Sequence, residues 1–161
     1  MQIISAREGD AAAICAVHKH SVRKKSSGNY SYEQLEAWIG SRRPDQYAWA
    51  MGEGGETMWV ARSDQKMVGF ASLKGSDLMA VYTTPEAPKG TGTALLEAVE
   101  QEAAMRGVLC LEATAFLNAA SFCERNGFKR IGDIELPLDG VPALRAVEMR
   151  KTLGGNRQNP I

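Results

Sequence analysis

Hydrophobic positions along the chain follow two periodicities, one typical of strands and one typical of helices. Short apolar runs bounded by turn residues predict strands, whereas apolar residues three or four positions apart predict helices. These patterns predict strands at 2–6, 57–62, 66–74, 78–83, 108–111, 128–135 and 143–153, and helices at 11–24, 32–39, 94–106 and 119–126. The resulting order, βααβββαβαββ, indicates an α/β (α+β) protein with a mixed sheet and helices on both faces.

The chain shows no sign of division into separate parts. The run 108–111 is apolar on both faces, as is typical of a covered parallel strand. The segment 44–57 follows neither periodicity and is predicted to be irregular. No repeat or linker interrupts the pattern, so we expect one domain over 1–153 and a disordered tail at 154–161.

Composition narrows the class of protein. The 161 residues include 44% hydrophobic and 24% charged side chains, which is ordinary for a globular domain. Nineteen basic residues balance nineteen acidic ones, so the electrostatic footprint of a general nucleic-acid binder is missing. There is no signal-peptide pattern and no apolar run of about 18 residues, so a membrane partner is not expected either.

Cysteine and histidine are too few and too scattered to predict a metal site. Cys15, Cys110 and Cys123 have no metal-type spacing, and reduced thiols in a cytoplasmic protein are the expected state. His18 and His20 stand two residues apart on a predicted helix, so they point to different faces and are interpreted as surface residues. We therefore expect no metal.

A glycine-rich loop leads directly into the predicted helix 94–106. The loop reads Lys89-Gly90-Thr91-Gly92-Thr93. Glycines at this place leave the first backbone N–H groups of a helix free to point at an anion, with the positive end of the helix dipole behind them. The pattern therefore predicts a site for a phosphate-bearing ligand.

Spacing excludes one of the three loop families that bind phosphate in this way and makes a second a weak match. A P-loop requires Gly-Lys followed by Ser or Thr, but here Lys89 precedes Gly90. A dinucleotide fingerprint requires Gly-x-Gly-x-x-Gly, and Leu95 occupies the place of its third glycine. A third family remains.

Two sequence blocks resemble the GNAT acyltransferases. The first consists of Val81-Tyr82-Thr83-Thr84-Pro85 and Gly90-Thr91-Gly92-Thr93-Ala94-Leu95-Leu96, which resemble the acetyl-CoA loop of that family. The second consists of Leu117-Asn118-Ala119 and Ser121-Phe122-Cys123-Glu124-Arg125-Asn126-Gly127-Phe128, which resemble its second conserved region. Both blocks have the family's order and spacing, and together they cover roughly residues 57–130. The resemblance implies a central, mostly antiparallel mixed sheet.

The resemblance also implies which residues bind acetyl-CoA as co-substrate. The pyrophosphate would lie on the N–H groups of 89–94, and the pantetheine arm would pair with 81–83 like an added strand. The implied cofactor-binding set is Val81, Tyr82, Thr83, Lys89, Gly90, Thr91, Gly92, Thr93, Ala94 and Asn118. A backbone N–H near Val81 or Tyr82 would hold the oxyanion of the tetrahedral intermediate. No covalent enzyme intermediate is implied, since placing an amine against the thioester can itself supply most of the acceleration.

The loop departs from the family pattern at its leading edge. Ala87 stands where the family usually has Gln or Arg, and Pro88 has no N–H to offer. The turn from Pro85 to Gly90 is also one residue shorter than usual. We expect CoA to bind more weakly or with a shifted pyrophosphate, with charge supplied by Lys89.

Cys123 stands where the family commonly has a tyrosine that protonates the departing CoA thiolate. A thiol with a reference pKa of about 8.5 is a stronger acid than a phenol at about 10, so Cys123 is a candidate general acid. A small buried cysteine that packs within an apolar helix is the alternative interpretation.

Candidates for the base and for the acceptor pocket come from two strands and one loop. Glu112 follows the buried run 108–111, near the expected C-terminal end of its strand, where α/β sheets place ligands. It is the candidate base, and Asp77 is a second acidic candidate that would contact the acceptor. Tyr30 and Tyr32 lie in the region that flanks the acceptor pocket in this family, so they are candidates for lining it.

Two functions from different classes follow. The first is a cytoplasmic N-acetyltransferase that transfers the acetyl group to an amine of a small molecule or peptide. The second is a non-catalytic acyl-CoA-binding module with a sensor or regulatory role, suggested by Ala87, Pro88 and Cys123. Dimers are common in the family, so a homodimer is an expected assembly. No motif identifies the acceptor.

Overall fold

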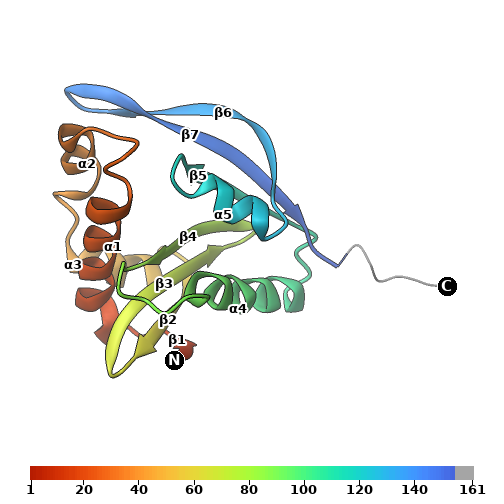
Figure 1. Cartoon of the computed structure of the whole chain (residues 1–161). Coiled ribbons are helices and arrows are strands. Elements are labelled where there is room, and N and C mark those ends of the chain that lie inside the picture. The colour runs from red at the N-terminus through yellow and green to blue at the C-terminus, as the bar shows by residue number, and fades with distance from the viewer. Residues whose placement is uncertain (155–161) are drawn as a thin grey trace.

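The computed structural model describes residues 1–154, so the predicted tail lies outside the described residues except for Gly154. A seven-stranded sheet has the order β1-β2-β3-β4-β5-β7-β6 (Figure 1). Its strands are β1 (Gln2–Ser5), β2 (Thr57–Ser63), β3 (Lys66–Lys74), β4 (Asp77–Thr83), β5 (Cys110–Phe116), β6 (Lys129–Leu138) and β7 (Val141–Thr152). Only β4 and β5 pair in parallel among these strands, which confirms the mixed, mostly antiparallel sheet.

Helices cover both faces of the sheet, as the sequence predicts. They are a 3-10 turn η1 (Glu8–Asp10), α1 (Ala11–Lys25), α2 (Tyr32–Ile39), α3 (Pro44–Met51), α4 (Thr91–Met105) and α5 (Ala120–Arg125). None of these described helices is long and apolar enough to cross a bilayer.

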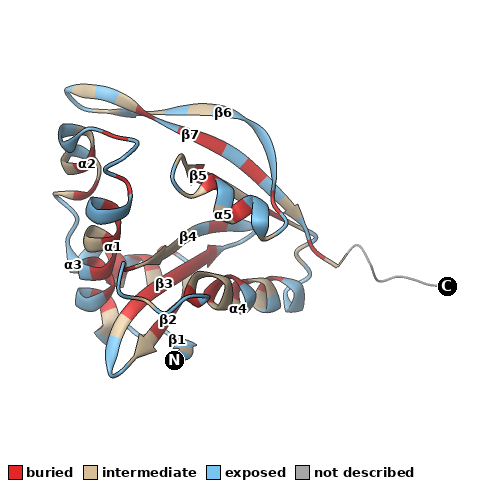
Figure 2. Cartoon of the chain, in the orientation of Figure 1, coloured by how far each residue is buried: buried red, intermediate tan, exposed pale blue. Residues whose placement is uncertain are grey.

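Alternate side chains of the central strands point to opposite faces of the sheet and contribute to two hydrophobic cores. On β2, Trp59 and Ala61 face a cluster with the apolar side of α4, while Met58 and Val60 face a cluster with α1 and α3. Successive residues of a strand point to opposite faces, so one strand serves both layers. In Figure 2 the buried positions accordingly concentrate along β3 and the inner sides of α1 and α4.

The structure corrects the prediction that 44–57 is irregular. Helix α3 occupies Pro44–Met51, with Pro44 at its first position. The Gln46 side chain accepts a hydrogen bond from the Arg43 N–H, which satisfies a donor at the start of the helix. Proline at this position is favourable because its missing N–H would have no helical partner. Tyr47 and Ala50 are the residues of α3 that reach the core, too few to give the sequence a clear helical rhythm.

Two other boundaries differ from those predicted. Helix α4 begins at Thr91 rather than at 94, because Gly90 has a φ of 91° and turns the chain into the helix. Strand β5 begins at Cys110 and runs to Phe116, whereas Leu109 is 76% exposed. The apolar run 108–111 therefore belongs partly to the connection before the strand.

Candidate active site

The candidate site opens where β4 and β5 separate. These neighbours pair in parallel at two positions, Asp77 with Glu112 and Leu78 with Ala113. Beyond that point the strands diverge toward their C-terminal ends (Figure 1). Two cavities meet at this gap, and both are lined by Tyr82 among other residues. The gap can therefore join a ligand on one face of the sheet to a ligand on the other.

A β-bulge lies at the point of separation. Ser72 of β3 faces Ala80 of β4, but Leu73 faces Leu78, which leaves Met79 as an extra residue. A bulge bends its strand and increases the local twist. The bend in β4 thus coincides with the loss of pairing to β5.

The cavity beside α4 and α5, which we call the groove, has a volume of about 280 Å³. Segments of both separated strands form its sides, and α5 and the start of α4 close it. The predicted residues that line it are Val81, Tyr82, Thr83, Gly92, Asn118 and Cys123. The structure therefore brings the two sequence blocks together in one place.

The glycine-rich loop continues from the groove to the start of α4. Thr91 is buried, and both its hydroxyl and its N–H donate to the Pro88 carbonyl, at 2.6 and 3.1 Å. The Ala94 N–H donates to the Gly90 carbonyl. Within the described chain, the N–H groups of Gly92 and Thr93 have no partner. We therefore expect an anion to contact these two donors, rather than the full loop from Lys89 to Ala94.

Gly92 connects the two blocks by close packing. A Cβ at this position would lie 3.0 Å from Cε1 of Phe122 on α5. Such a contact is shorter than carbon atoms normally approach. Glycine at 92 thus permits α5 to lie against the start of α4 while leaving the backbone open to the groove.

Backbone direction distinguishes Val81 from Tyr82. The Thr84 N–H donates to the Val68 carbonyl of β3, and Tyr82 faces Phe70 in the same register. Because hydrogen-bonded positions alternate along an antiparallel pair, Tyr82 directs its N–H toward β3. Val81 directs its N–H toward the gap. We infer that Val81, and not Tyr82, offers the backbone donor predicted for an oxyanion.

The C-terminal end of α1 closes one end of the groove. The Lys25 ammonium donates to the Thr83 hydroxyl at 2.6 Å, and the Ser26 hydroxyl donates to the Asn118 side-chain oxygen at 3.1 Å. Partial burial lowers the pKa of Lys25. Lys25 was not among the predicted site residues, although three basic residues in the last turn of a helix were a visible signal.

Cys123 lies in the groove as predicted, but its acidity is not what its reference value suggests. The side chain is 7% exposed, and burial, with a smaller contribution from Glu124, raises the pKa of the thiol to about 11. The thiol is thus a weaker acid than an ordinary phenol, which removes the expected advantage over tyrosine. It stays protonated at neutral pH.

The cavity beside α1 and α3, which we call the pocket, has a volume of about 520 Å³. Aromatic rings are part of its lining, and its charged lining residues within the described chain are Arg42, Glu56, Asp77, Glu112 and Glu148. No three His, Cys, Asp or Glu side chains of residues 1–154 are placed to share a metal ion.

Glu112 lies in the pocket but not at the end of its strand. It is the third residue of β5, beside Asp77 on β4, and its carboxylate forms an ion pair with Arg150 at 3.1 Å. The predicted location near the C-terminal end was wrong because β5 extends four residues beyond Glu112, to Phe116. Both acidic candidates nevertheless line the same pocket.

His18 is buried, contrary to the surface location that the sequence predicted. Its Nδ1 is hydrogen-bonded to the Tyr47 hydroxyl at 2.7 Å, and its ring packs 4.3 Å from that of Tyr82. Its Nε2 has no partner among the described residues. Burial, reinforced by the positive charge of Arg42, lowers the pKa of His18 to about 3, so the ring is neutral. Burial likewise raises the pKa of Tyr47 and of Tyr82.

The structure does not bring Tyr30 and Tyr32 to the pocket. The Tyr30 hydroxyl donates to the Arg145 carbonyl and accepts from the Leu117 N–H, so this ring joins the loop before α2 to β7 and to the residue after β5. Tyr32 is 73% exposed at the start of α2. Trp38, six residues later, lines both cavities instead.

Residues 27–153 match the family described as Acetyltransferase (GNAT) domain. The chain belongs to the GNAT family of acetyltransferases. No curated protein sequence matches it. A GNAT crystal structure from Rhodopseudomonas palustris, described as "Aminotransferase, Class-II", is 30% identical, with a TM-score of 0.85 over 94% of this chain and 95% of that one.

Two further GNAT-fold structures show the same fold at lower identity. PaiA N-acetyltransferase from Thermoplasma acidophilum, solved with coenzyme A, is 23% identical, with a TM-score of 0.75 over 94% of this chain and 99% of that one. The putative acetyltransferase YncA from Salmonella typhimurium, solved with acetyl-CoA, is 21% identical, with a TM-score of 0.71 over 99% and 98%. The predicted GNAT fold is thus confirmed, and the protein is an acetyltransferase by family.

Sequence reasoning missed several residues of this GNAT pocket. Gln46 belongs to the segment predicted as irregular, Arg42 lies just before that segment, and His18 was interpreted as exposed. None of them stands in a family block. Their shared feature, the pocket, exists only once α1, α3 and the sheet are packed together.

Proposed function

We propose that this GNAT domain is an acetyl-CoA-dependent N-acetyltransferase that transfers the acetyl group directly to an amine. The observation that carries the proposal is the gap between β4 and β5, where the groove and the pocket meet. The groove suits a pantetheine arm, and the pocket suits an acceptor on the opposite face. The gap is where a thioester and an amine would meet.

The groove fits CoA by its backbone rather than by its side chains. The free N–H groups of Gly92 and Thr93 at the start of α4 suit a pyrophosphate, and Lys25 adds a positive charge along the groove. The unpaired edge of β4 suits the amides of the pantetheine arm, which would add to the sheet as a further strand. Loss of a donor at Pro88 does not remove these contacts.

The residues of this chain then supply positioning, charge stabilisation and proton transfer. The amine nitrogen bonds to the acetyl carbon while the Val81 N–H donates to the developing oxyanion. The C–S bond breaks as the intermediate collapses, the amine proton passes to a carboxylate in the pocket, and the thiolate takes a proton. We assign the base to Glu112, directly or through water, because it lines the pocket beside the gap.

Cys123 is poorly suited to give the thiolate its proton. With a pKa of about 11, its thiol is a weaker acid than an ordinary thiol at about 8.5, so the transfer would be uphill. We favour departure of the sulfur as a thiolate that solvent in the open groove protonates afterwards, and Cys123 then serves packing within α5.

The acyl-CoA-binding module without catalysis is the second candidate. Cys123 in place of tyrosine and the altered edge of the loop, Ala87-Pro88, favour it. The presence of a charged pocket on the far side of the gap favours the enzyme, since a sensor needs no second ligand site.

Titration with acetyl-CoA and assay of CoA release against a panel of amines test the proposal. An acetyltransferase should bind acetyl-CoA and release CoA faster with at least one amine, with the acetylated amine detected by mass spectrometry. Tight acetyl-CoA binding with no product from any amine would support the sensor. A homodimer and a cytoplasmic location remain part of the proposal.

A further inference from the structure

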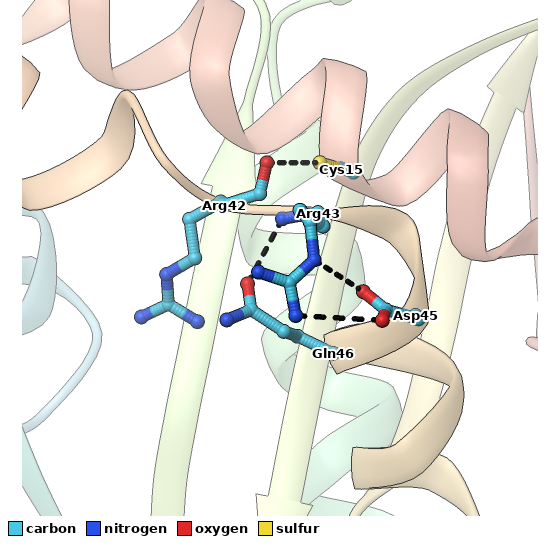
Figure 3. A network of polar contacts seen from close by, with 5 residues as sticks. All are labelled: Cys15, Arg42, Arg43, Asp45 and Gln46. Carbon is cyan, nitrogen blue, oxygen red and sulfur yellow. Dashed lines mark hydrogen bonds and ion pairs between the residues drawn. The ribbon is translucent and has the colours of Figure 1, made fainter.

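Arg42 is a positive charge without a partner in a pocket that otherwise carries negative charges. It precedes Arg43, whose guanidinium pairs with Asp45 at 3.1 Å. The guanidinium of Arg42 forms no hydrogen bond or ion pair with any residue of 1–154, and Figure 3 shows it pointing away from the Arg43–Asp45 pair. The two adjacent arginines thus differ: Arg43 is paired with a carboxylate of the chain, whereas the Arg42 guanidinium is available to pair with a ligand.

The backbone of Arg42 is held in place while its side chain is free. The Cys15 thiol of α1 donates to the Arg42 carbonyl at 3.6 Å, and the guanidinium carbon lies 6.0 Å from the centre of the Tyr47 ring. Contact with an aromatic face is favourable for a guanidinium and limits its freedom. The charge is close enough to the centre of the pocket to contribute to the lowered pKa of His18.

Gln46 adds a second donor beside this charge. Its side-chain oxygen accepts from the Arg43 N–H at 2.9 Å, which fixes the orientation of the amide. The amide nitrogen then points the other way, toward the guanidinium of Arg42 in Figure 3, and has no partner among the described residues. Both Arg42 and Gln46 line the pocket.

A guanidinium and an amide that donate side by side match the two oxygens of a carboxylate. The other charged residues of the pocket are carboxylates, and those of Glu56, Asp77 and Glu148 have no ion-pair partner in the described chain. They suit the positive charge of an amine before it is deprotonated.

We propose that Arg42 and Gln46 bind the carboxylate of the acceptor, so that the substrate is a small amino carboxylate such as an amino acid. The proposal rests on the proposed N-acetyltransferase function and names its substrate class. A pocket of about 520 Å³ is large enough for a molecule of that size. A polyamine without an anionic group would leave Arg42 unpaired.

The test compares acceptors that differ only in the carboxylate. Amino acids of increasing chain length and their carboxamides are assayed as acceptors, with rates expressed per free amine. The wild type should favour the acid over its amide by roughly tenfold or more in kcat/KM, as expected for charge-assisted hydrogen bonds. R42Q should abolish that preference by raising KM for the acid, with kcat little changed, and R42E should reverse it.

Two further variants separate a specific contact from a general effect of charge. Q46E keeps the acceptor for the Arg43 N–H but places a second carboxylate where the amide donates, so it should weaken binding of acids selectively. R43Q removes a neighbouring charge of the same sign and should leave the acid-to-amide ratio unchanged. An unchanged ratio in R42Q, or an equal loss in R43Q, would overturn the proposal.

Binding measured by calorimetry, in the absence of an acetyl donor, tests the role of Arg42 separately from the proposed N-acetyltransferase function. Binding of each acid and its amide is measured in the presence of CoA, for the wild type and for R42Q. Selective binding of the acid without any acetylated product would preserve the role of Arg42 and contradict the N-acetyltransferase function. Turnover of amines with no preference for acids, or a better reaction with polyamines, would contradict the role of Arg42 alone.

Discussion

The two cavities on either side of the β4–β5 gap are built in different ways. The groove offers a ligand chiefly the unpaired edge of β4 and the start of α4 at Gly92, beside small residues and the rings of Trp38, Tyr82 and Phe122. The pocket is made of long charged side chains and aromatic rings that come from all three N-terminal helices and most of the strands. A ligand of the groove is held by local chain geometry, and a ligand of the pocket by side chains that meet only in space.

Because of this difference, we expect the two sites to respond differently to substitution. A backbone N–H survives any substitution except proline, so the donors of Gly92 and Thr93 remain beside Ala87 and Pro88. A pocket built from side chains changes its ligand when one charge changes. Variants on each side of the gap should therefore alter one ligand and spare the other.

Glu112→Gln should have the largest effect, and only on the acceptor side. The pocket would lose the carboxylate that takes the amine proton, so kcat/KM for the acceptor should fall by about 100-fold at low pH. The loss should shrink as pH rises, because the free amine becomes abundant, and CoA affinity should not change. The measurement is a pH–rate profile together with a CoA titration.

Glu148→Gln is the matched control, since Glu148 lines the same pocket but has no ion pair with Arg150. This variant should raise KM for the acceptor, because Glu148 lines the pocket that receives the charged amine, but it should leave the shape of the pH–rate profile unchanged. A pH–rate profile of Glu112→Gln that parallels the wild type would exclude Glu112 as the base.

Gly92→Val should have the next largest effect, and only in the groove. A Cβ already meets Phe122 at 3.0 Å, and a branched side chain would displace that ring into the groove and cover the free N–H groups. The Kd for CoA should rise about tenfold, equivalent to about 1.4 kcal/mol. Calorimetry measures it.

Gly132→Val is the control for an added side chain, because a Cβ at Gly132 meets nothing within 4 Å. It should leave the Kd unchanged. If a folded Gly92→Val protein bound CoA as tightly as the wild type, contact of the cofactor with the start of α4 would be excluded.

His18 should make the wall of the pocket sensitive to acid. Its pKa is about 3 in the folded protein and 6.5 when unperturbed, so between these values the unfolded chain binds more protons. Stability should therefore fall as pH falls below about 6, by about 1.4 kcal/mol per pH unit at most. Urea unfolding at pH 7, 5 and 4 measures the slope.

His18→Phe removes the titrating group and fits the surrounding ring cluster. It should be less stable at pH 7, because the Tyr47 hydroxyl loses its partner, but its stability should depend less on pH. Equal slopes for the two proteins would show that His18 is not the source of the acid sensitivity.

Cys123→Ala should have the smallest effect. A buried thiol with a pKa of about 11 is a poor donor, so turnover should stay within about threefold of the wild type. Loss of buried volume should lower stability by about 1 kcal/mol. A tenfold fall in turnover with unchanged CoA affinity would instead return Cys123 to the role of general acid.

Most elements and the lining of the groove could be predicted because their signals are local. Alternation on the central strands, the capping box of α2 and the glycines before α4 each depend on residues within a few positions of one another. Helix α3 was missed because only Tyr47 and Ala50 reach the core. The place of Glu112 in its strand was also predicted wrongly, since polar alternation after an apolar run hides the true extent of β5.

The sequence by itself determined the family, most of the sheet and the glycine-rich loop before α4, since these depend on backbone geometry that neighbouring residues set. Only the tertiary structure decided that His18 is buried, that the Tyr30 hydroxyl is hydrogen-bonded to backbone groups, and that Arg42 has no ion-pair partner in the pocket. Burial and charge pairing depend on contacts between residues far apart in the chain, and no local pattern reports them.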